Sequence, residues 1–204
     1  FIPTAPSEYA SLFDVVVSAA SIYGGSWKEG AGAVFAENQA LRWLADLADF
    51  PETSGGVFVS GGTVGNLSAL VAARNDARSK SGNFQRWVIA CSTEAHSSIK
   101  AAAEVMDVDV LQIPTDKNHA LQGSTVAFEV DQFHNANPSK RVFAIIATAG
   151  TTNLGIIDDL AGIGKAANDR SIWYHIDGAY GLAALASPKT KPLFSGVELA
   201  DSLI

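Results

Sequence analysis

The sequence of 204 residues is long enough for one large domain or for a large piece of a bigger protein. Hydrophobic residues make up 48% of the chain and charged residues 17%, a composition that can bury a core and argues against disorder. The formal net charge of −7 makes a nucleic-acid partner unexpected, because an acidic surface repels phosphate backbones. No apolar run approaches the roughly 18 residues of a membrane span, so no membrane partner is expected either.

The single cysteine, Cys91, lies in an apolar run, which favours a buried, inert thiol over a nucleophile. One thiol cannot form a disulfide framework, and with the scattered histidines it makes no zinc-ligand spacing, so we expect a cytoplasmic protein without a metal. The chain opens at Phe1 as though inside a longer sequence, and residues 200–204 resemble the start of a buried strand. We therefore expect a piece of a longer protein, with a helical N-terminal segment in residues 1–50 and a large domain in residues 51–204.

Segments with helical periodicity alternate with short apolar runs along the chain. Glycines within residues 24–32 predict a loop between the first two helices, and residues 56–60 predict a short strand or a turn. Apolar strands without alternation belong to a sheet that is covered on both faces. The βαβα order predicts an α/β fold with three layers, α/β/α, around a mostly parallel sheet. The predicted helices are 8–22, 34–49, 63–80, 97–105, 124–134 and 158–168, and the predicted strands are 86–91, 108–113, 142–148 and 172–176.

The first segment with possible chemistry is Ser60–Asn66, Ser-Gly-Gly-Thr-Val-Gly-Asn, at the start of a predicted helix. Glycines there allow a ligand to approach the backbone, and the N–H groups of a helix start suit an anion such as phosphate. The hydroxyl of Thr63 could bind that anion or simply cap the helix. The segment lacks both the Walker A pattern and the Gly-x-Gly-x-x-Gly pattern.

The second segment is Glu94–Ser98, which places His96 between a strand and a helix. That position lies at the edge of the sheet where ligands bind. The imidazole could stack on an aromatic cofactor, or it could be an ordinary polar residue of a helix start.

The third segment is Ala147–Gly155, which follows the most apolar run of the chain. Its small hydroxyl residues could donate hydrogen bonds to a ligand. They could equally satisfy only the backbone of a turn.

The fourth segment is Trp173–Gly181, in which Asp177 ends a buried strand. A charged carboxylate there is costly unless it is paired, and a protonated heterocyclic nitrogen would be a fitting partner. Gly178 and Ala179 are small enough for a flat ring to lie against them. The alternative is an aspartate that caps a turn.

At these four segments the sequence resembles the group II decarboxylases that depend on pyridoxal phosphate (PLP), a family that includes aromatic L-amino-acid, glutamate, histidine and 2,4-diaminobutyrate decarboxylases. The motifs Ser-Gly-Gly-Thr, Ala-His-Ser-Ser, Thr-Ala-Gly-Thr-Thr and His-Ile-Asp-Gly-Ala-Tyr-Gly occur in the family's order and at similar separations. Weaker similarity extends over nearly the whole chain. The resemblance implies pyridoxal 5'-phosphate as cofactor, the large domain of a type I PLP enzyme, and a homodimer with the active site at the subunit interface.

The resemblance also implies which residues contact the cofactor. Gly62 and Thr63 correspond to the positions that hold its phosphate, and Thr152 corresponds to a further cofactor-contacting threonine. Ala179 corresponds to the small residue on one face of the pyridine ring.

Two residues acquire catalytic roles by the same resemblance. His96 corresponds to the histidine that stacks on the pyridine ring and lies close to the substrate. Asp177 corresponds to the carboxylate that pairs with the pyridine nitrogen. Thr4 resembles a position on the substrate side of aromatic decarboxylases.

The family's cofactor-binding lysine lies in an Asp-x-His-Lys segment beyond Ala-Asp-Ser-Leu, and this chain ends at Ile204 before such a segment. Lys165, Lys189 and Lys191 do not match that motif. We therefore expect this polypeptide alone to be inactive and its parent to decarboxylate an L-amino acid, with an aromatic substrate slightly favoured by Ala-His-Ser-Ser. Another type I PLP lyase or aminotransferase, or a non-catalytic domain that kept the fold, remains an alternative.

Overall fold

The computed structural model describes residues 5–81 and 86–204, and the chain divides into two compact units, Phe1–Phe58 and Val59–Ile204. The first unit contains the helices α1 (Glu8–Ala20) and α2 (Trp27–Leu47). Within the described ranges, no helix is both long enough and apolar enough to cross a membrane.

The loop predicted within residues 24–32 is wrong in its second half, because Gly30 and Gly32 lie inside α2. The helix begins early because Ser26 caps it: Oγ of Ser26 accepts a hydrogen bond from the N–H of Glu29 at 3.3 Å. Gly30 nevertheless kinks the helix, because its φ and ψ angles of −127° and 36° are not helical.

Residues 56–59 form neither a strand nor a turn, so the short strand or turn expected at 56–60 is also wrong. Val57 and Phe58 are exposed, and the N–H of Phe58 donates to a carboxylate oxygen of Glu37 at 2.9 Å rather than to a neighbouring strand. The apolar character of this run does not bring it into the five-stranded sheet.

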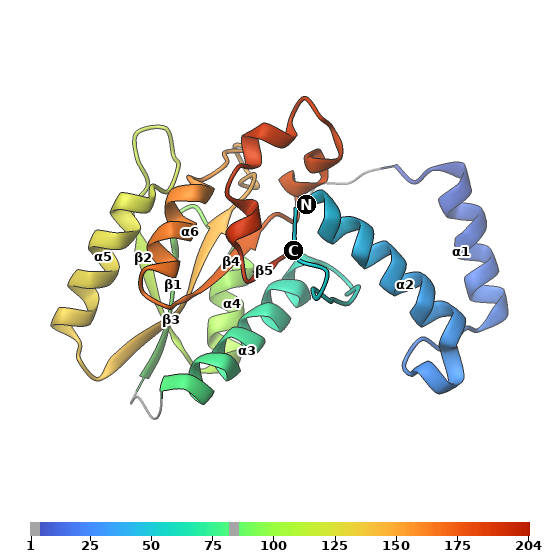
Figure 1. The fold of residues 1–204 in the computed structure, drawn as a ribbon, viewed down its shortest axis with the longest axis horizontal. Coiled ribbons are helices and arrows are strands. Elements are labelled where there is room, and N and C mark those ends of the chain that lie inside the picture. Colours follow the sequence, from blue (N-terminus) through green and yellow to red (C-terminus); the bar gives the residue numbers. More distant parts are fainter. Residues whose placement is uncertain (1–4, 82–85) are drawn as a thin grey trace. The chain divides into compact units, whose positions relative to one another are not determined.

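The second unit is a five-stranded sheet with helices on both faces (Figure 1). The strand order is β2-β1-β3-β4-β5, and every neighbouring pair is parallel. The strands are β1 (Arg86–Ser92), β2 (Asp109–Ile113), β3 (Lys140–Thr148), β4 (Trp173–Asp177) and β5 (Ser202–Leu203). The helices are α3 (Gly62–Ser81), α4 (Ser97–Met106), α5 (Gly123–Ala136) and α6 (Leu160–Asn168), followed by the 3₁₀ helices η1 (Gly181–Ala186), η2 (Lys191–Phe194) and η3 (Val197–Leu199).

The helices form the two outer layers. Helix α3 packs beside α4 on one face of the sheet, and α5 packs beside α6 on the other (Figure 1). Right-handed crossovers explain this division, because the chain moves outward from β1 to β2 through α4 and then reverses direction through α5 and α6. The predicted three-layer fold and its parallel sheet are confirmed.

The strands β1, β3 and β4 are buried as the continuous apolar runs predicted, whereas the edge strands β2 and β5 are only partly buried. Ile89, Ile145 and Ile176, one from each of three adjacent strands, are fully buried. The chain leaves β1 on one side toward β2 and later returns on the other side as β3, so the strand order reverses between β1 and β3. Such a reversal opens a crevice at the carboxyl ends of the strands.

Helices α5 and α6 approach each other closely at Gly123, and this contact provides a test of the packing. A Cβ atom added to Gly123 would overlap the backbone of Gly162. We expect Gly123→Ala to lower the free energy of unfolding by about 1–3 kcal/mol, because the two helices must separate. Urea unfolding would measure the loss. The control Ser124→Ala changes an exposed residue on the same turn of α5 and should have little effect; equal stabilities of the two variants would contradict the close packing.

Candidate functional site

The predicted segments meet at one edge of the sheet. His96 follows β1, Thr148 ends β3 and Asp177 ends β4. Because these strands are parallel, their carboxyl ends lie on the same side, where ligands bind in open α/β sheets. The segment Ser60–Asn66 reaches this edge through Asn66, which hydrogen-bonds to Asp177.

The carboxylate of Asp177 is buried and accepts only two hydrogen bonds from the described residues. The residue is 6% exposed. Its Oδ2 accepts a hydrogen bond from Nδ2 of Asn66 at 3.0 Å, and its Oδ1 accepts a longer one from the N–H of Ala179 at 3.3 Å. A carboxylate can accept about four hydrogen bonds, and in the described part of the chain no lysine or arginine forms an ion pair with it. The position therefore suits a positively charged ligand group.

The imidazole of His96 makes hydrogen bonds at Nδ1, and the rest of the ring is exposed. His96 is the N-cap of α4, where its Nδ1 accepts the N–H of Ser98 at 3.2 Å. The same Nδ1 lies 2.9 Å from Oγ of Ser98. His96 is exposed, so the rest of its ring is accessible to a ligand.

Asn66 joins these two parts of the site. Its Nδ2 donates to Oγ of Ser98 at 2.9 Å and to Oδ2 of Asp177 at 3.0 Å. Asn66 and Ser98 are both buried. The structure thus brings His96 and Asp177 into one hydrogen-bonded group, and the two residues that connect them had no role assigned from sequence.

Gly62 and Thr63 begin α3 beside Ala179. A Cβ atom added to Gly62 would lie 3.0 Å from Cβ of Ala179, so the helix start and the turn after β4 approach closely because both residues are small. The first turn of this 20-residue helix presents backbone N–H groups and the positive end of the helix dipole. Thr63 is exposed, so its hydroxyl can reach an anion at this helix end.

Thr152 is not brought into the group. It lies in the exposed turn after β3, and no hydrogen bond in the described residues joins it to His96 or Asp177. Its neighbour Thr151 is buried, and Oγ1 of Thr151 accepts the N–H of Ile156 at 3.1 Å, which stabilises the turn. Thr4 lies outside the described residues.

Asp158 is a buried carboxylate with no role assigned from sequence. Its Oδ2 accepts the N–H of Thr148 at 2.7 Å, and its Oδ1 accepts the N–H of Leu121 at 2.8 Å. Burial raises the pKa of Asp158 to about 6, against the opposing effect of these two bonds. Asp158 thereby anchors the end of β3 that carries the threonine turn.

His175 is a second buried titratable group that sequence reasoning missed. It is fully buried on β4, and burial lowers its pKa to about 4, so the imidazole is neutral near pH 7. Its Nε2 lies 2.9 Å from Oδ1 of Asn66 and its Nδ1 lies 2.9 Å from Oγ of Ser202. A histidine two residues before the strand-ending aspartate was the available signal, but strand alternation alone does not identify its partners.

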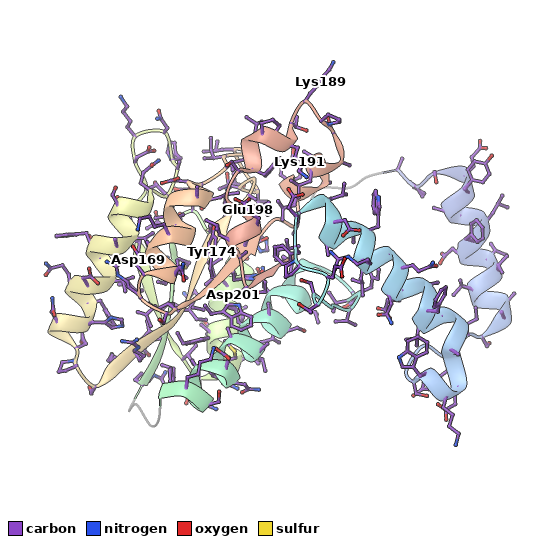
Figure 2. All side chains as sticks on the ribbon, in the orientation of Figure 1. Asp169, Tyr174, Lys189, Lys191, Glu198 and Asp201 are labelled. Carbon is purple, nitrogen blue, oxygen red and sulfur yellow. The ribbon has the colours of Figure 1, made fainter. Side chains whose placement is uncertain are left out.

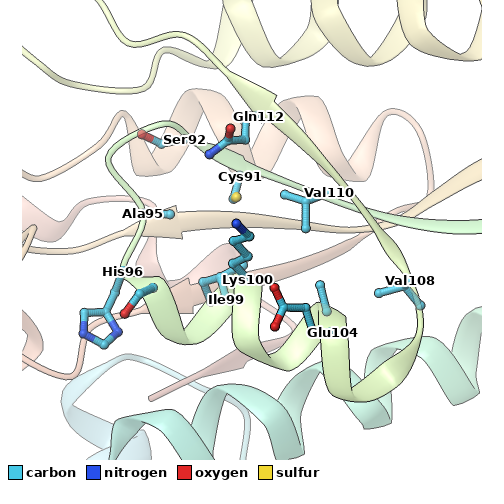
Figure 3. Close-up of a pocket in the computed structure, with 12 residues that line it drawn as sticks. Cys91, Ser92, Ala95, His96, Ile99, Lys100, Glu104, Val108, Val110 and Gln112 are labelled. Carbon is cyan, nitrogen blue, oxygen red and sulfur yellow. The ribbon is translucent and has the colours of Figure 1, made fainter.

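A cavity of about 440 Å³ lies between α4 and the strands β1 and β2 and is lined at one end by His96 (Figure 3). Cys91 lines it and is buried as expected, and burial raises the pKa of its thiol to about 12. In Figure 3 the imidazole of His96 lies at the opposite end of the cavity from Val108 and points away from Cys91. The cavity therefore adds no nucleophile to the group around Asp177.

Two of the lysines named from sequence lie at the surface. Nζ of Lys165 pairs with Oδ2 of Asp169 at 2.7 Å, and Lys189 projects outward from the loop before η2 (Figure 2). In the described residues neither lysine hydrogen-bonds to Asp177 or to His96. Nor does the described part of the chain contain a cluster of three or more His, Cys, Asp or Glu side chains that could hold a metal.

Comparison with known families gives one match over the whole chain. The conserved domain of pyridoxal-dependent decarboxylases matches residues 1–204. An aromatic-L-amino-acid decarboxylase from Bacillus atrophaeus is 32% identical and covers 100% of this chain, which spans 42% of that relative. An L-2,4-diaminobutyrate decarboxylase from Rhizobium meliloti is 34% identical over 93% of this chain and 38% of the relative. The chain thus spans less than half the length of these relatives.

Solved structures show the same similarity in three dimensions. The glutamate decarboxylase domain of a diaminobutyrate–pyruvate transaminase and L-2,4-diaminobutyrate decarboxylase from Vibrio parahaemolyticus has a TM-score of 0.90, with 30% identity over 98% of this chain and 46% of that chain. The 4-hydroxyphenylacetaldehyde synthase of Rhodiola rosea has a TM-score of 0.91, with 27% identity over 100% of this chain and 46% of that one.

Proposed function

Because the chain belongs to the pyridoxal-dependent decarboxylase family, we propose that the complete gene product is a PLP-dependent carboxy-lyase that decarboxylates an L-amino acid. The buried, partly compensated carboxylate of Asp177 carries this proposal. A protonated pyridine nitrogen would supply the positive charge that this carboxylate lacks within the described residues. In that arrangement Asp177 is a catalytic residue, since it holds the proton on the ring nitrogen.

The residues around Asp177 fit the rest of the cofactor. Gly62 and Thr63 would bind the phosphate through the N–H groups and hydroxyl at the start of α3. Ala179 would lie against one face of the ring and His96 against the other, with His96 also close to the substrate. Thr152 and Thr4 are proposed as a cofactor contact and a substrate contact from the resemblance alone. The cofactor, when bound, supplies an electron sink for the carbanion that remains after CO2 leaves.

For the substrate we propose an aromatic L-amino acid. The Ala-His-Ser-Ser sequence around His96 favours it, and so does the similarity to aromatic-L-amino-acid decarboxylases. The relative named as a diaminobutyrate decarboxylase is about as similar, so a diamino acid is the second candidate. Similarity to a 4-hydroxyphenylacetaldehyde synthase adds an aldehyde-forming lyase as a third.

One experiment separates these candidates. The complete gene product, purified with added PLP, is assayed for CO2, amine, aldehyde and ammonia with a panel of aromatic, acidic and diamino L-amino acids. We expect CO2 and amine in equal amounts from the aromatic members. Aldehyde with ammonia would instead identify an aldehyde-forming lyase. Failure to bind PLP would contradict the whole proposal and favour a non-catalytic domain of the same fold.

We further propose that the protein forms a homodimer in the cytoplasm. Helix α1 has no buried residue, although it carries Leu12, Phe13 and Val16, all more than half exposed. An apolar surface of this kind is typical of an interface, and a second copy would cover it in a homodimeric enzyme. Sedimentation of the complete gene product should give twice the monomer mass. Leu12→Glu should shift the equilibrium toward monomer, whereas Lys28→Glu should not.

A further inference from the structure

We propose that Asn66 and Ser98 are positioning residues that fix the tautomer of His96, with its proton on Nε2, through a directed chain of hydrogen bonds. The chain runs from Trp173 through Ser202, His175, Asn66 and Ser98 to His96. Its relevance to catalysis rests on the proposed function, in which His96 faces the cofactor. The tautomer itself does not depend on that function.

The direction of the chain is fixed at Asn66. Oδ2 of Asp177 accepts a hydrogen bond from the amide nitrogen of Asn66 at 3.0 Å. The carbonyl oxygen of Asn66 therefore faces His175 and needs a donor there. Nε2 of His175 must carry the proton.

The other end of the chain agrees with this direction. His175 is neutral, because burial lowers its pKa to about 4, so its Nδ1 has no proton and accepts one from the hydroxyl of Ser202. Oγ of Ser202 in turn accepts the N–H of the Trp173 indole at 2.8 Å, and an indole can only donate. The Trp173 end is thus consistent with the direction that Asp177 sets through Asn66.

The direction of the hydrogen bonds from Asn66 to His96 follows from assigning each amide proton of Asn66 to an acceptor. One amide proton of Asn66 goes to Asp177 and the other to Oγ of Ser98. The hydroxyl proton of Ser98 is then directed to Nδ1 of His96, which also accepts the backbone N–H of Ser98. Two donors at Nδ1 leave Nε2 as the protonated nitrogen. His96 can therefore offer one N–H, at Nε2, to a bound ligand.

The tautomer can be observed without cofactor or turnover. The complete gene product, stripped of PLP, is labelled with ¹⁵N-histidine and examined by NMR at about pH 9, where imidazoles are uncharged and the tautomer can be read directly, and the signals of His96 are identified by their loss in His96→Gln. We expect His96 with Nδ1 unprotonated and Nε2 protonated. A protonated Nδ1 in the wild-type protein would overturn the proposal.

Variants test whether the chain causes this state. Ser98→Ala removes the hydroxyl donor at 2.9 Å and leaves only the longer backbone N–H bond at 3.2 Å, and Asn66→Ala removes the group that directs the hydroxyl. In each variant a measurable share of the tautomer protonated at Nδ1 should appear beside the wild-type one. Ser98→Thr keeps a hydroxyl and should preserve the wild-type signals. Ser97→Ala, at the exposed adjacent serine, should leave them unchanged. If Ser98→Ala and Asn66→Ala both fold, by circular dichroism, and both keep the wild-type signals, the chain does not set the tautomer.

The outcome is independent of the proposed function. A protein that shows the expected tautomer and its partial loss in Ser98→Ala, but binds no PLP, supports the hydrogen-bond chain and contradicts the decarboxylase. A protein that binds PLP and releases CO2 while His96 carries its proton on Nδ1 supports the decarboxylase and contradicts the chain.

Discussion

Replacement of Asp177 by asparagine should lower kcat/KM of the complete gene product by on the order of 10²–10³-fold, the range seen when one preorganised electrostatic partner of a reacting group is removed. Asparagine keeps the size of the side chain and an oxygen that can accept from Nδ2 of Asn66. It removes the negative charge that would hold a proton on the pyridine nitrogen. The loss should therefore appear in turnover and in cofactor retention, with little change in the free energy of unfolding.

Two further variants test whether the loss of activity comes from the charge of Asp177. Asp177→Ala should lose activity to a similar extent and also lose stability, because an amide proton of buried Asn66 would have no acceptor; the cost of such a group is about 1–3 kcal/mol. Asp169→Asn, at an exposed aspartate on the same unit (Figure 2), should keep wild-type activity. The assay measures CO2 release and the PLP that stays bound after gel filtration. Unchanged turnover in Asp177→Asn would remove Asp177 from its proposed role.

The layers of the fold were predictable from sequence because they depend on local patterns. Runs such as 87–91 and 142–147 are apolar at every position, and only a sheet covered on both faces buries such strands completely. The wrong predictions arose where another requirement outweighed the local pattern. At Gly30 the cap at Ser26 outweighed the poor helix propensity of glycine. At 56–60 the apolar residues had β propensity, but strand formation also requires a neighbouring strand to pair with.

The sequence was sufficient to predict that His96 and Asp177 lie in the candidate site, but not the hydrogen bonds that join them. His96 and Asp177 follow strands whose carboxyl ends meet at one edge, and the order of helices and strands is enough to infer that meeting. The links through Asn66 depend on how α3 and α4 pack against the sheet. The contact between His175 and Ser202 depends on the register of β4 with β5, which pairs these two residues. Neither helix packing nor strand register can be read from local periodicity.

The two buried titratable groups that sequence reasoning missed should oppose each other in the pH dependence of stability. The pKa of His175 falls from about 6.5 to about 4 on folding, so the unfolded chain binds more protons between these values and stability is lost as the pH falls through them. The pKa of Asp158 rises from about 3.8 to about 6, so the folded chain binds more protons there and stability is lost as the pH rises. Each effect is about 3 kcal/mol, at about 1.4 kcal/mol per pKa unit.

Single substitutions should reveal each effect by removing the other. Relative to the wild-type protein, Asp158→Asn should become less stable as the pH falls from about 6 to about 4, by about 3 kcal/mol, because only the His175 effect remains. His175→Gln should change in the opposite direction, becoming more stable relative to the wild type over the same fall in pH. Urea unfolding followed by tryptophan fluorescence at a series of pH values measures both differences, and subtracting the wild-type curve cancels the contribution of the surface carboxylates. Asp169→Asn, at an exposed position, should give a curve parallel to the wild type. If both variants run parallel to the wild type as well, burial does not shift these two pKa values, and the neutral His175 on which the direction of the hydrogen-bond chain depends would lose its support.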